Sequence, residues 1–295
     1  MNDIIRLRDV ECRDCYKCIR NCPVKAIRYS DGRAEIVTHE CILCGECVVT
    51  CPQRGDFVFS QVDEIRKLIA EGRRVVASIA PSFVSDLPVG SIEGMRATLQ
   101  AMGFYDAEET AIGAEIVARE YERLMREDDM SLLISSCCTS VVMLIKRYYP
   151  QVLPFLAPVK SPMEIHCAML KQKYPDACTV FVGPCYAKKG EALHSDAVDY
   201  VLTFYELHEW MRSAGIEPVN IPIKPGDGPP LSAPGWAGEI HVARGGLEPC
   251  GDRWRERLHC GAERDQARRR PQDVYRNDGV RGQLRQWPRH SQESL

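Results

Sequence analysis

A repeated cysteine pattern constrains this chain more than any other feature of its sequence. The pattern Cys-x2-Cys-x2-Cys-x3-Cys-Pro occurs twice, at Cys12, Cys15, Cys18, Cys22 and Pro23 and again at Cys41, Cys44, Cys47, Cys51 and Pro52. Steps of three let three thiolates surround one corner of a compact cluster, while the fourth cysteine, directed outward by the following proline, reaches the neighbouring cluster. The repeat therefore predicts two 4Fe-4S clusters.

The predicted ligand sets cross between the two motifs. One cluster takes Cys12, Cys15, Cys18 and Cys51, and the other takes Cys41, Cys44, Cys47 and Cys22. A disulfide scaffold is the first alternative, but such frameworks belong to short secreted chains, and the N-terminus has no signal-peptide pattern. Zinc is the second, but its usual paired Cys-x2-Cys sites leave the third cysteine and the Cys-Pro step without a role. Residues 1–58 resemble the bacterial two-cluster ferredoxin module, which implies an α+β ferredoxin-like N-terminal domain.

Length and charge narrow the remaining possibilities. A chain of 295 residues is too long for a ferredoxin alone and leaves room for further domains with their own cores. The sequence contains no apolar run of eighteen residues, so no membrane span is expected, and the net charge of -3 argues against a general nucleic-acid binder. Cysteines kept as thiolate ligands fit a reducing compartment, which predicts a cytoplasmic protein.

Residues 59–228 show the pattern of an α/β domain with a parallel sheet. Short apolar runs indicate buried strands, and helical spacing of apolar residues separates them. Expected strands are 75–80, 132–134, 179–182 and 200–203, and expected helices are 61–70, 92–103, 106–126, 141–149 and 205–214.

Two expected strands end in cysteine. Cys137 and Cys138 follow residues 132–134, and Cys185 follows residues 179–182, with Lys188 and Glu191 just beyond. The carboxyl ends of parallel strands meet at the edge where α/β sheets bind ligands, so the sequence favours a shared metal site there. The ordinary alternatives are that the cysteines are small buried residues or turn residues and that Lys188 and Lys189 begin a solvated helix.

The order of the motifs resembles the FeFe hydrogenase family. The ferredoxin-like repeat is followed by Ser135-Ser136-Cys137-Cys138 and then by Gly183-Pro184-Cys185-Tyr186-Ala187-Lys188-Lys189-Gly190-Glu191, over about residues 1–225. The resemblance implies an active-site cluster made of a 4Fe-4S cubane and a di-iron centre. It implies that Cys138 and Cys185 bind the cubane, that Cys137 transfers protons, that Lys188 holds a cyanide ligand and that Glu191 lies on the proton route. Such a thiol titrates close enough to neutral pH to donate and accept protons in turn. For His166, Cys167 and Cys178, which lie on an expected helix and before a strand, we expect core positions.

The third signature of that family, which supplies two further cysteines, has no match. Only Cys250 and Cys260 remain, without the close spacing that the family requires. After residue 241 there are twelve arginines and no lysine, and the βα pattern stops. We therefore expect residues 229–295 to form an irregular tail. We also expect this segment to be translated from a shifted reading frame of the gene.

The functional expectation is an iron-sulfur redox protein that passes electrons through two clusters to a hydrogenase-like site. Hydrogen oxidation, proton reduction and hydrogen or redox sensing remain open, and so does catalysis itself. The alternative is a ferredoxin-type electron carrier or adaptor without an active-site cluster. Either function requires a redox partner protein, such as a ferredoxin, and the sequence leaves the oligomeric state open.

Overall fold

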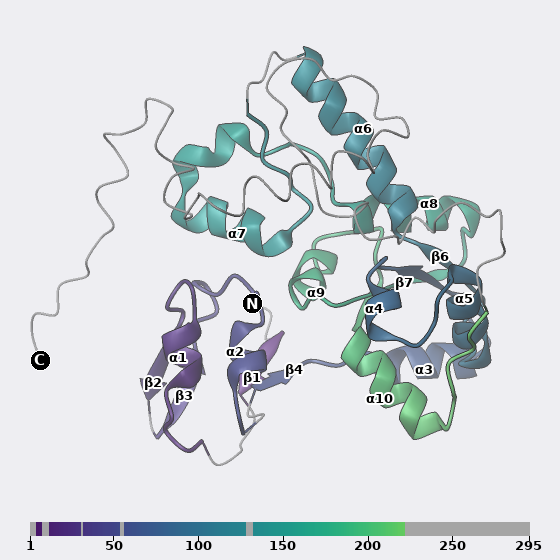
Figure 1. The fold of residues 1–295 in the computed structure, drawn as a ribbon, viewed down its shortest axis with the longest axis horizontal. Helices are drawn as coiled ribbons and strands as arrows, with labels where there is room; N and C mark the ends of the chain where they lie inside the picture. The colour runs from purple at the N-terminus through teal and green to yellow at the C-terminus, as the bar shows by residue number, and fades with distance from the viewer. Residues whose placement is uncertain (1–3, 8–11, 31, 54–55, 128–131, 222–295) are drawn as a thin grey trace, which may run out of the picture. The chain divides into compact units, whose positions relative to one another are not determined.

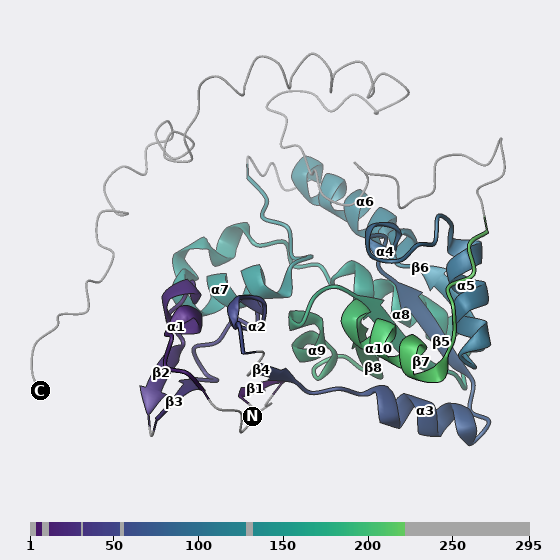
Figure 2. The ribbon, with the colours of Figure 1, turned by 60° about the horizontal axis from the view of Figure 1, so that its bottom comes forward.

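The computed structural model describes residues 4–7, 12–30, 32–53, 56–127 and 132–221. Figures 1 and 2 show two kinds of architecture along this part of the chain, a small module of short helices and strands followed by a larger layered body. No helix among the described residues is long and apolar enough to cross a membrane. The predicted tail, residues 229–295, lies outside the described residues.

The small module consists of two antiparallel strand pairs and two short helices. β1 pairs with β4, and β2 pairs with β3, with Ile27 opposite Ile36. A small core that includes Cys22, Ala26, Ala34 and Cys47 holds the elements together. The elements are β1 (Ile5–Leu7), α1 (Lys17–Asn21), β2 (Ile27–Ser30), β3 (Arg33–Ile36), α2 (Glu46–Thr50) and β4 (Asp56–Val58).

The cysteine repeat is also a structural repeat, with an offset of 29 residues. α1 and α2 are equivalent segments, and each ends at the fourth cysteine of its motif. Asp14 and Leu43 are equivalent and share a left-handed backbone, with φ of 50° and 57°. Left-handed backbone is uncommon for residues other than glycine, so its recurrence at equivalent positions indicates that both cysteine loops are shaped to one geometry.

The body is built on a four-stranded parallel sheet in the order β6-β5-β7-β8. β5 and β7 are buried along their whole length, as expected for central strands covered on both faces. The body's strands are β5 (Val75–Ile79), β6 (Asp106–Glu109), β7 (Cys178–Gly183) and β8 (Tyr200–Thr203). This confirms the mixed α/β class with a parallel sheet.

Helices cover both faces of that sheet (Figure 2). Alternate residues of β5 point to opposite layers, since Val75 and Ile79 join the main core while Ser78 bonds to His166 of α8. The main core also takes Leu207 and Trp210 from α10, and α8 lies between the sheet and α6. The helices are α3 (Val62–Ala70), α4 (Phe83–Asp86), α5 (Ile92–Ala101), α6 (Ala111–Glu127), α7 (Thr139–Tyr148), the 3-10 helix η1 (Pro150–Phe155), α8 (Pro162–Lys173), α9 (Ala187–Ala192) and α10 (Phe204–Ala214).

The predicted helix 106–126 begins too early, because its first four residues form the edge strand β6. Ala107 and Glu109 point inward and are buried. Asp106 is held by Arg96 at 2.8 Å and by the hydroxyl of Tyr174 at 2.6 Å. These tertiary partners allow an acidic segment to pair as a strand, although its own sequence carries little strand propensity.

The predicted strand 132–134 does not join the sheet. Ile134 makes a single parallel bridge to Leu156. The Ile134 N-H donates to the carbonyl of Phe155, and the Ala157 N-H donates to the carbonyl of Ile134. Leu133 packs in a separate small cluster with Val117 and Tyr121 of α6. The segment is extended as expected, but only Leu133 is buried while Leu132 is 43% exposed, and it pairs with residues 155–157 and not with a strand of the parallel sheet.

Candidate functional site

One predicted cluster site is recognisable as a small cavity in the cysteine module. It is lined by Cys41, Cys44 and Cys47 of the second motif together with Cys22 of the first. The spacing predicts that these same four residues bind one cluster, and the structure brings them to one cavity. The donor chemistry fits an iron-sulfur cluster, because four thiols and few other polar groups face one apolar enclosure.

The other predicted set is brought together less completely. The thiols of Cys15 and Cys51 both lie near the side-chain oxygen of Gln53, at 3.9 and 3.8 Å. Cys51 of the second motif therefore lies beside Cys15 of the first, as crossing requires. Cys12 is exposed and Cys18 is half-buried. The ligand assignments stay predictions that these placements support.

Burial affects the chemistry of the second motif. It raises the pKa of the Cys41 and Cys44 thiols above the ordinary value, with a smaller opposing effect of backbone N-H groups. As free thiols these residues are therefore protonated at neutral pH. Because iron binds the thiolate form, assembly of a cluster there releases protons.

The second cysteine motif also contacts the α/β body. The Arg147 guanidinium donates to the carbonyl of Cys41, and the Tyr148 hydroxyl donates to the carbonyl of Glu40 at 2.8 Å. Gly45 lies against the ring of Tyr186, so close that a Cβ at this position would overlap a ring carbon. The cysteine motif thus meets both α7 and the turn before α9, the two segments that follow the body's cysteines.

Lys188 connects the two cysteine-bearing segments of the body. Its ammonium donates to the carbonyl of Cys137 at 3.1 Å and lies 2.7 Å from the Glu191 carboxylate. Its backbone N-H bonds to the carbonyl of Cys185, 3.3 Å away. The side chains of Lys188 and Lys189 are both buried, which excludes the alternative of a solvated helix start. The sequence-predicted residues Cys137, Lys188 and Glu191 are therefore in one place.

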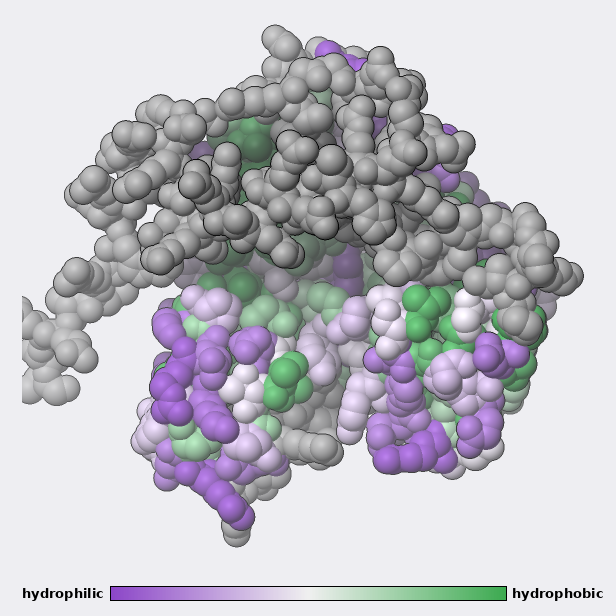
Figure 3. Space-filling model, viewed as in Figure 1, coloured by the Kyte–Doolittle hydropathy of each residue, from purple (hydrophilic) through white to green (hydrophobic). Residues whose placement is uncertain are grey.

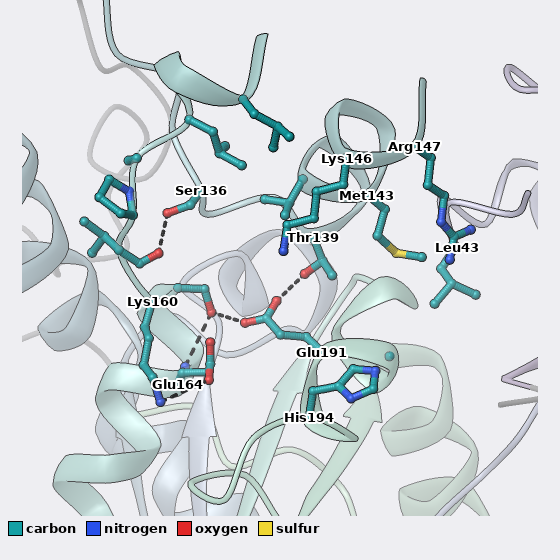
Figure 4. A pocket seen from close by; sticks show the side chains of 18 of the residues that line it. Leu43, Ser136, Thr139, Met143, Lys146, Arg147, Lys160, Glu164, Glu191 and His194 are labelled. Carbon is teal, nitrogen blue, oxygen red and sulfur yellow. Dashed lines mark hydrogen bonds and ion pairs between the residues drawn. The ribbon is translucent and has the colours of Figure 1, made fainter. Parts of the chain in front are cut away.

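Glu191 accepts hydrogen bonds from two hydroxyls that the sequence reasoning did not single out. Thr139 begins α7 directly after Cys138, and Ser161 caps α8. Figure 4 shows the Thr139 bond and Lys146 extending from α7 nearby. Two sequence features could have identified these hydroxyls: Thr139 follows a proposed ligand, and Ser161 precedes a proline at the start of a helix.

Thr139, Ser161 and Glu191 line a cavity of about 780 Å³.

Tyr121 of α6 is a second residue that the sequence reasoning did not assign to the site. Its hydroxyl accepts from the backbone N-H of Ser136 at 2.9 Å and lies 3.5 Å from the Cys137 thiol. Burial raises the pKa of this phenol, and the Cys137 contact adds to the effect. In the sequence, Tyr121 was recognisable only as part of the apolar face of a predicted helix. Helical spacing of apolar residues carries no information about the hydrogen bonds of its hydroxyl.

The thiols proposed to bind a cubane are less enclosed. Cys138 is exposed at the N-cap of α7, and Cys185 is half-buried in the turn after β7. Among the described residues, no three Cys, His, Asp or Glu side chains stand at the spacing of a single-ion site. The structure therefore joins the two segments through Lys188, and ligation by Cys138 and Cys185 stays a prediction.

The residues expected to belong to the core are placed there. His166 is fully buried, with its Nδ1 2.8 Å from the Ser78 hydroxyl and its Nε2 3.6 Å from the Glu108 carboxylate. Cys167 and Cys178 are buried, and burial raises the pKa of each thiol to about 12. Such thiols are poor nucleophiles at neutral pH.

Models of known protein families match both the cysteine module and the α/β body. The family model for the iron only hydrogenase large subunit, C-terminal domain, matches residues 73–277, and a 4Fe-4S dicluster domain model matches residues 4–52. The chain is 30% identical over 251 residues to the periplasmic Fe hydrogenase large subunit of Nitratidesulfovibrio vulgaris, covering 74% of this chain and 60% of that protein.

Two further relatives differ in their described roles. The chain is 27% identical over 241 residues to the NADP-reducing hydrogenase subunit HndD of Solidesulfovibrio fructosivorans, covering 70% of this chain and 41% of that one. It is 26% identical over 200 residues to a probable cytosolic Fe-S cluster assembly factor of Nematostella vectensis, covering 56% and 45%. The chain thus spans between two fifths and three fifths of the length of these relatives. It is a 4Fe-4S iron-sulfur protein that belongs to the iron-only hydrogenase large-subunit family.

Proposed function

We propose that this chain relays single electrons from its cysteine module to the hydrogenase-like site around Cys137, Cys138 and Cys185. The observation that carries the proposal is the contact between the second cysteine motif and the segments that follow the body's cysteines, through Arg147 and Tyr186. Two 4Fe-4S clusters supply one-electron chemistry when bound, and their ligands are the two crossed cysteine sets. In the family, the activity at such a site is hydrogen oxidation, proton reduction or hydrogen sensing.

The chain's own residues have distinct roles in this proposal. Cys138 and Cys185 would hold part of an active-site cluster, which supplies hydride-binding iron when present. Cys137 would donate and accept protons at its sulfur, and the Tyr121 hydroxyl beside it fixes the loop through the Ser136 N-H. Lys188, held by Glu191, presents a buried ammonium at the carbonyl of Cys137.

A second candidate function is an electron carrier or adaptor without an active-site cluster. Two observations favour it: the cysteines of the third family signature have no matching positions in the sequence, and one relative is a probable cluster assembly factor and not a hydrogenase. Both candidates share the two-cluster module, so they differ only at the site around Cys137.

Iron content and infrared spectra after anaerobic expression with hydrogenase maturation proteins separate the two candidates. A chain in which only the cysteine module binds clusters should give about eight iron and eight sulfide, no cyanide or carbon monoxide bands and no hydrogen turnover, because only two of four cubane ligands have matches. That result would establish the second candidate and would exclude relay to the Cys137 site. About fourteen iron with such bands would establish the first. About four iron or fewer, or zinc in the cysteine module, would refute both.

A further inference from the structure

The two halves of the cysteine repeat carry opposite charge, although their backbone is duplicated. At the offset of 29 residues, Arg13 corresponds to Ile42, Lys17 to Glu46 and Arg20 to Val49. Lys25 does have a basic counterpart, Arg54, so the contrast between the halves lies in Arg13, Lys17 and Arg20. Since the second half has a complete cysteine motif without these cations, cluster binding does not require them in the first half. Their presence needs another explanation.

The cations of the first half form an exposed basic face. Its members are Arg13, Lys17, Arg20 and Lys25. Lys17 and Arg20 lie three residues apart on α1, and so on the same side of the helix. The Lys25 ammonium bonds to the carbonyl of Arg20 at 2.8 Å, which places it at the end of the same helix. Within the described part of the chain, none of the four forms an ion pair with a carboxylate, so the positive charge of the face is available to a partner.

An exposed pair of aromatic rings accompanies the charge. The rings of Tyr16 and Tyr29 lie with their centroids 5.1 Å apart and are 42% and 37% exposed. Asp14, the one carboxylate among residues 12–30, accepts a hydrogen bond from the Tyr29 hydroxyl at 2.6 Å. Tyrosine is enriched in protein interfaces, because it offers a rigid apolar face with a polar end. Figure 3 shows that hydrophilic side chains dominate the visible surface over α1, β2 and β3.

The basic face is also the accessible end of the module. The second motif is engaged with the body through Cys41, Gly45 and Leu43, which lies against Gly190. Cys12, the first predicted ligand of the other cluster, is exposed and adjacent to Arg13. A partner can therefore approach the first motif beside the four cations, away from the second motif's contacts with the body.

We propose that the face formed by Arg13, Lys17, Arg20 and Lys25 around Tyr16 and Tyr29 docks an acidic one-electron carrier protein. Positive charge concentrated beside an electron entry point raises the rate of encounter with an acidic partner and orients it, and the effect weakens as salt is added. In the step itself, one electron leaves the reduced carrier, which is thereby oxidised, and enters the cluster held by Cys12, which is reduced by one; no proton or bond is exchanged. The proposal rests on the cysteine module and not on hydrogen chemistry.

The test measures binding of a plant-type 2Fe-2S ferredoxin with an acidic surface to the anaerobically purified protein, by isothermal titration at low and high ionic strength. The variant is Lys17→Glu with Arg20→Val. These substitutions give the first motif the residues found at the equivalent positions of the second motif, Glu46 and Val49. The matched control is Arg119→Glu with Arg126→Val, on the exposed face of α6, which removes the same charge from the chain. Iron content shows whether the clusters are retained.

We expect the variant to bind the oxidised ferredoxin about tenfold more weakly than wild type at low ionic strength, while the α6 control remains near wild type. The difference should vanish at high salt. In stopped-flow experiments, reduction by the ferredoxin should slow by a similar factor, whereas reduction by the small cation of reduced methyl viologen should not slow. Wild-type affinity in the variant, or an equal loss in the control, would overturn the docking face without affecting the proposed function of the Cys137 site.

Discussion

The Lys188 ammonium and the Glu191 carboxylate form an ion pair at 2.7 Å, with only 10% and 13% of their side chains exposed. Removing one member of a buried pair leaves the other charge uncompensated, at a cost of about 3–5 kcal/mol. We therefore expect Glu191→Gln to lower the free energy of unfolding by an amount near the lower end of that range, because its amide still bonds to Thr139 or Ser161. Urea unfolding of the anaerobically purified protein measures the loss.

The exposed pair Lys67 and Glu71 provides the control for that prediction. Their charged atoms lie 3.9 Å apart, and their side chains are 78% and 52% exposed. Glu71→Gln should change the free energy of unfolding by no more than about 0.5 kcal/mol, because solvent screens the interaction. Equal effects of the two substitutions would show that the Lys188 pair is not buried in the protein.

Double replacement of cysteines can decide whether the ligand sets cross. If Cys22 belongs with Cys41, Cys44 and Cys47, Cys22→Ser should remove about four of about eight iron atoms, and adding Cys44→Ser should remove no more. Adding Cys12→Ser should instead remove both clusters. Local ligation predicts the reverse pattern for the two double variants. Cys167→Ala, at a buried thiol that is no proposed ligand, should keep all of the iron.

The buried imidazole of His166 should make stability depend on pH. Burial lowers its pKa below the ordinary 6.5, against a smaller opposing effect of Glu108. The unfolded chain therefore binds the proton more readily, so the contribution of this residue to stability is fully present above pH 6.5. It is lost as pH falls through the lower folded-state pKa. The slope reaches at most about 1.4 kcal/mol per pH unit for one proton.

Comparing wild type with His166→Gln isolates that contribution. Glutamine can still bond to the Ser78 hydroxyl but does not titrate. Free energies of unfolding measured by urea between pH 5.5 and 7.5 should converge for the two proteins as pH falls. The pKa of Asp106 lies below its ordinary 3.8, since the bonds from Tyr174 and Ala107 outweigh burial, so this group contributes outside that window. Parallel curves would contradict the prediction.

The gene sequence tests the expectation of a frameshift near residue 229. Read one nucleotide later, codon 236 and the first base of codon 237 must give glycine, and a continuing frame with a pair of closely spaced cysteines should follow. The family match extends to residue 277, well into the segment in question. An early stop codon in the shifted frame would show that the sequence is the true product.

Local sequence made the cysteine module predictable, because three of the four ligands proposed for each cluster lie within one short motif. The spacing of the motifs predicted both crossed sets, and the structure places Cys22 in one cavity with Cys41, Cys44 and Cys47. β5 and β7 were also predictable, since a strand covered on both faces must be apolar along its whole length. In these cases the constraint is local, and so the sequence displays it.

Only the tertiary structure decided the features that depend on partners distant in sequence. β6 is acidic, and it pairs as a strand because Arg96 and Tyr174 hold Asp106. Segment 132–134 lies apart from the sheet because its partner is Leu156. Glu191 accepts hydrogen bonds from Thr139 and Ser161, which lie 52 and 30 residues away in the sequence, and no sequence pattern specifies such a meeting. The sequence by itself thus determined which chemistry the chain carries, whereas packing between distant segments decided which side chains surround it, because burial and long-range hydrogen bonds are properties of the folded chain alone.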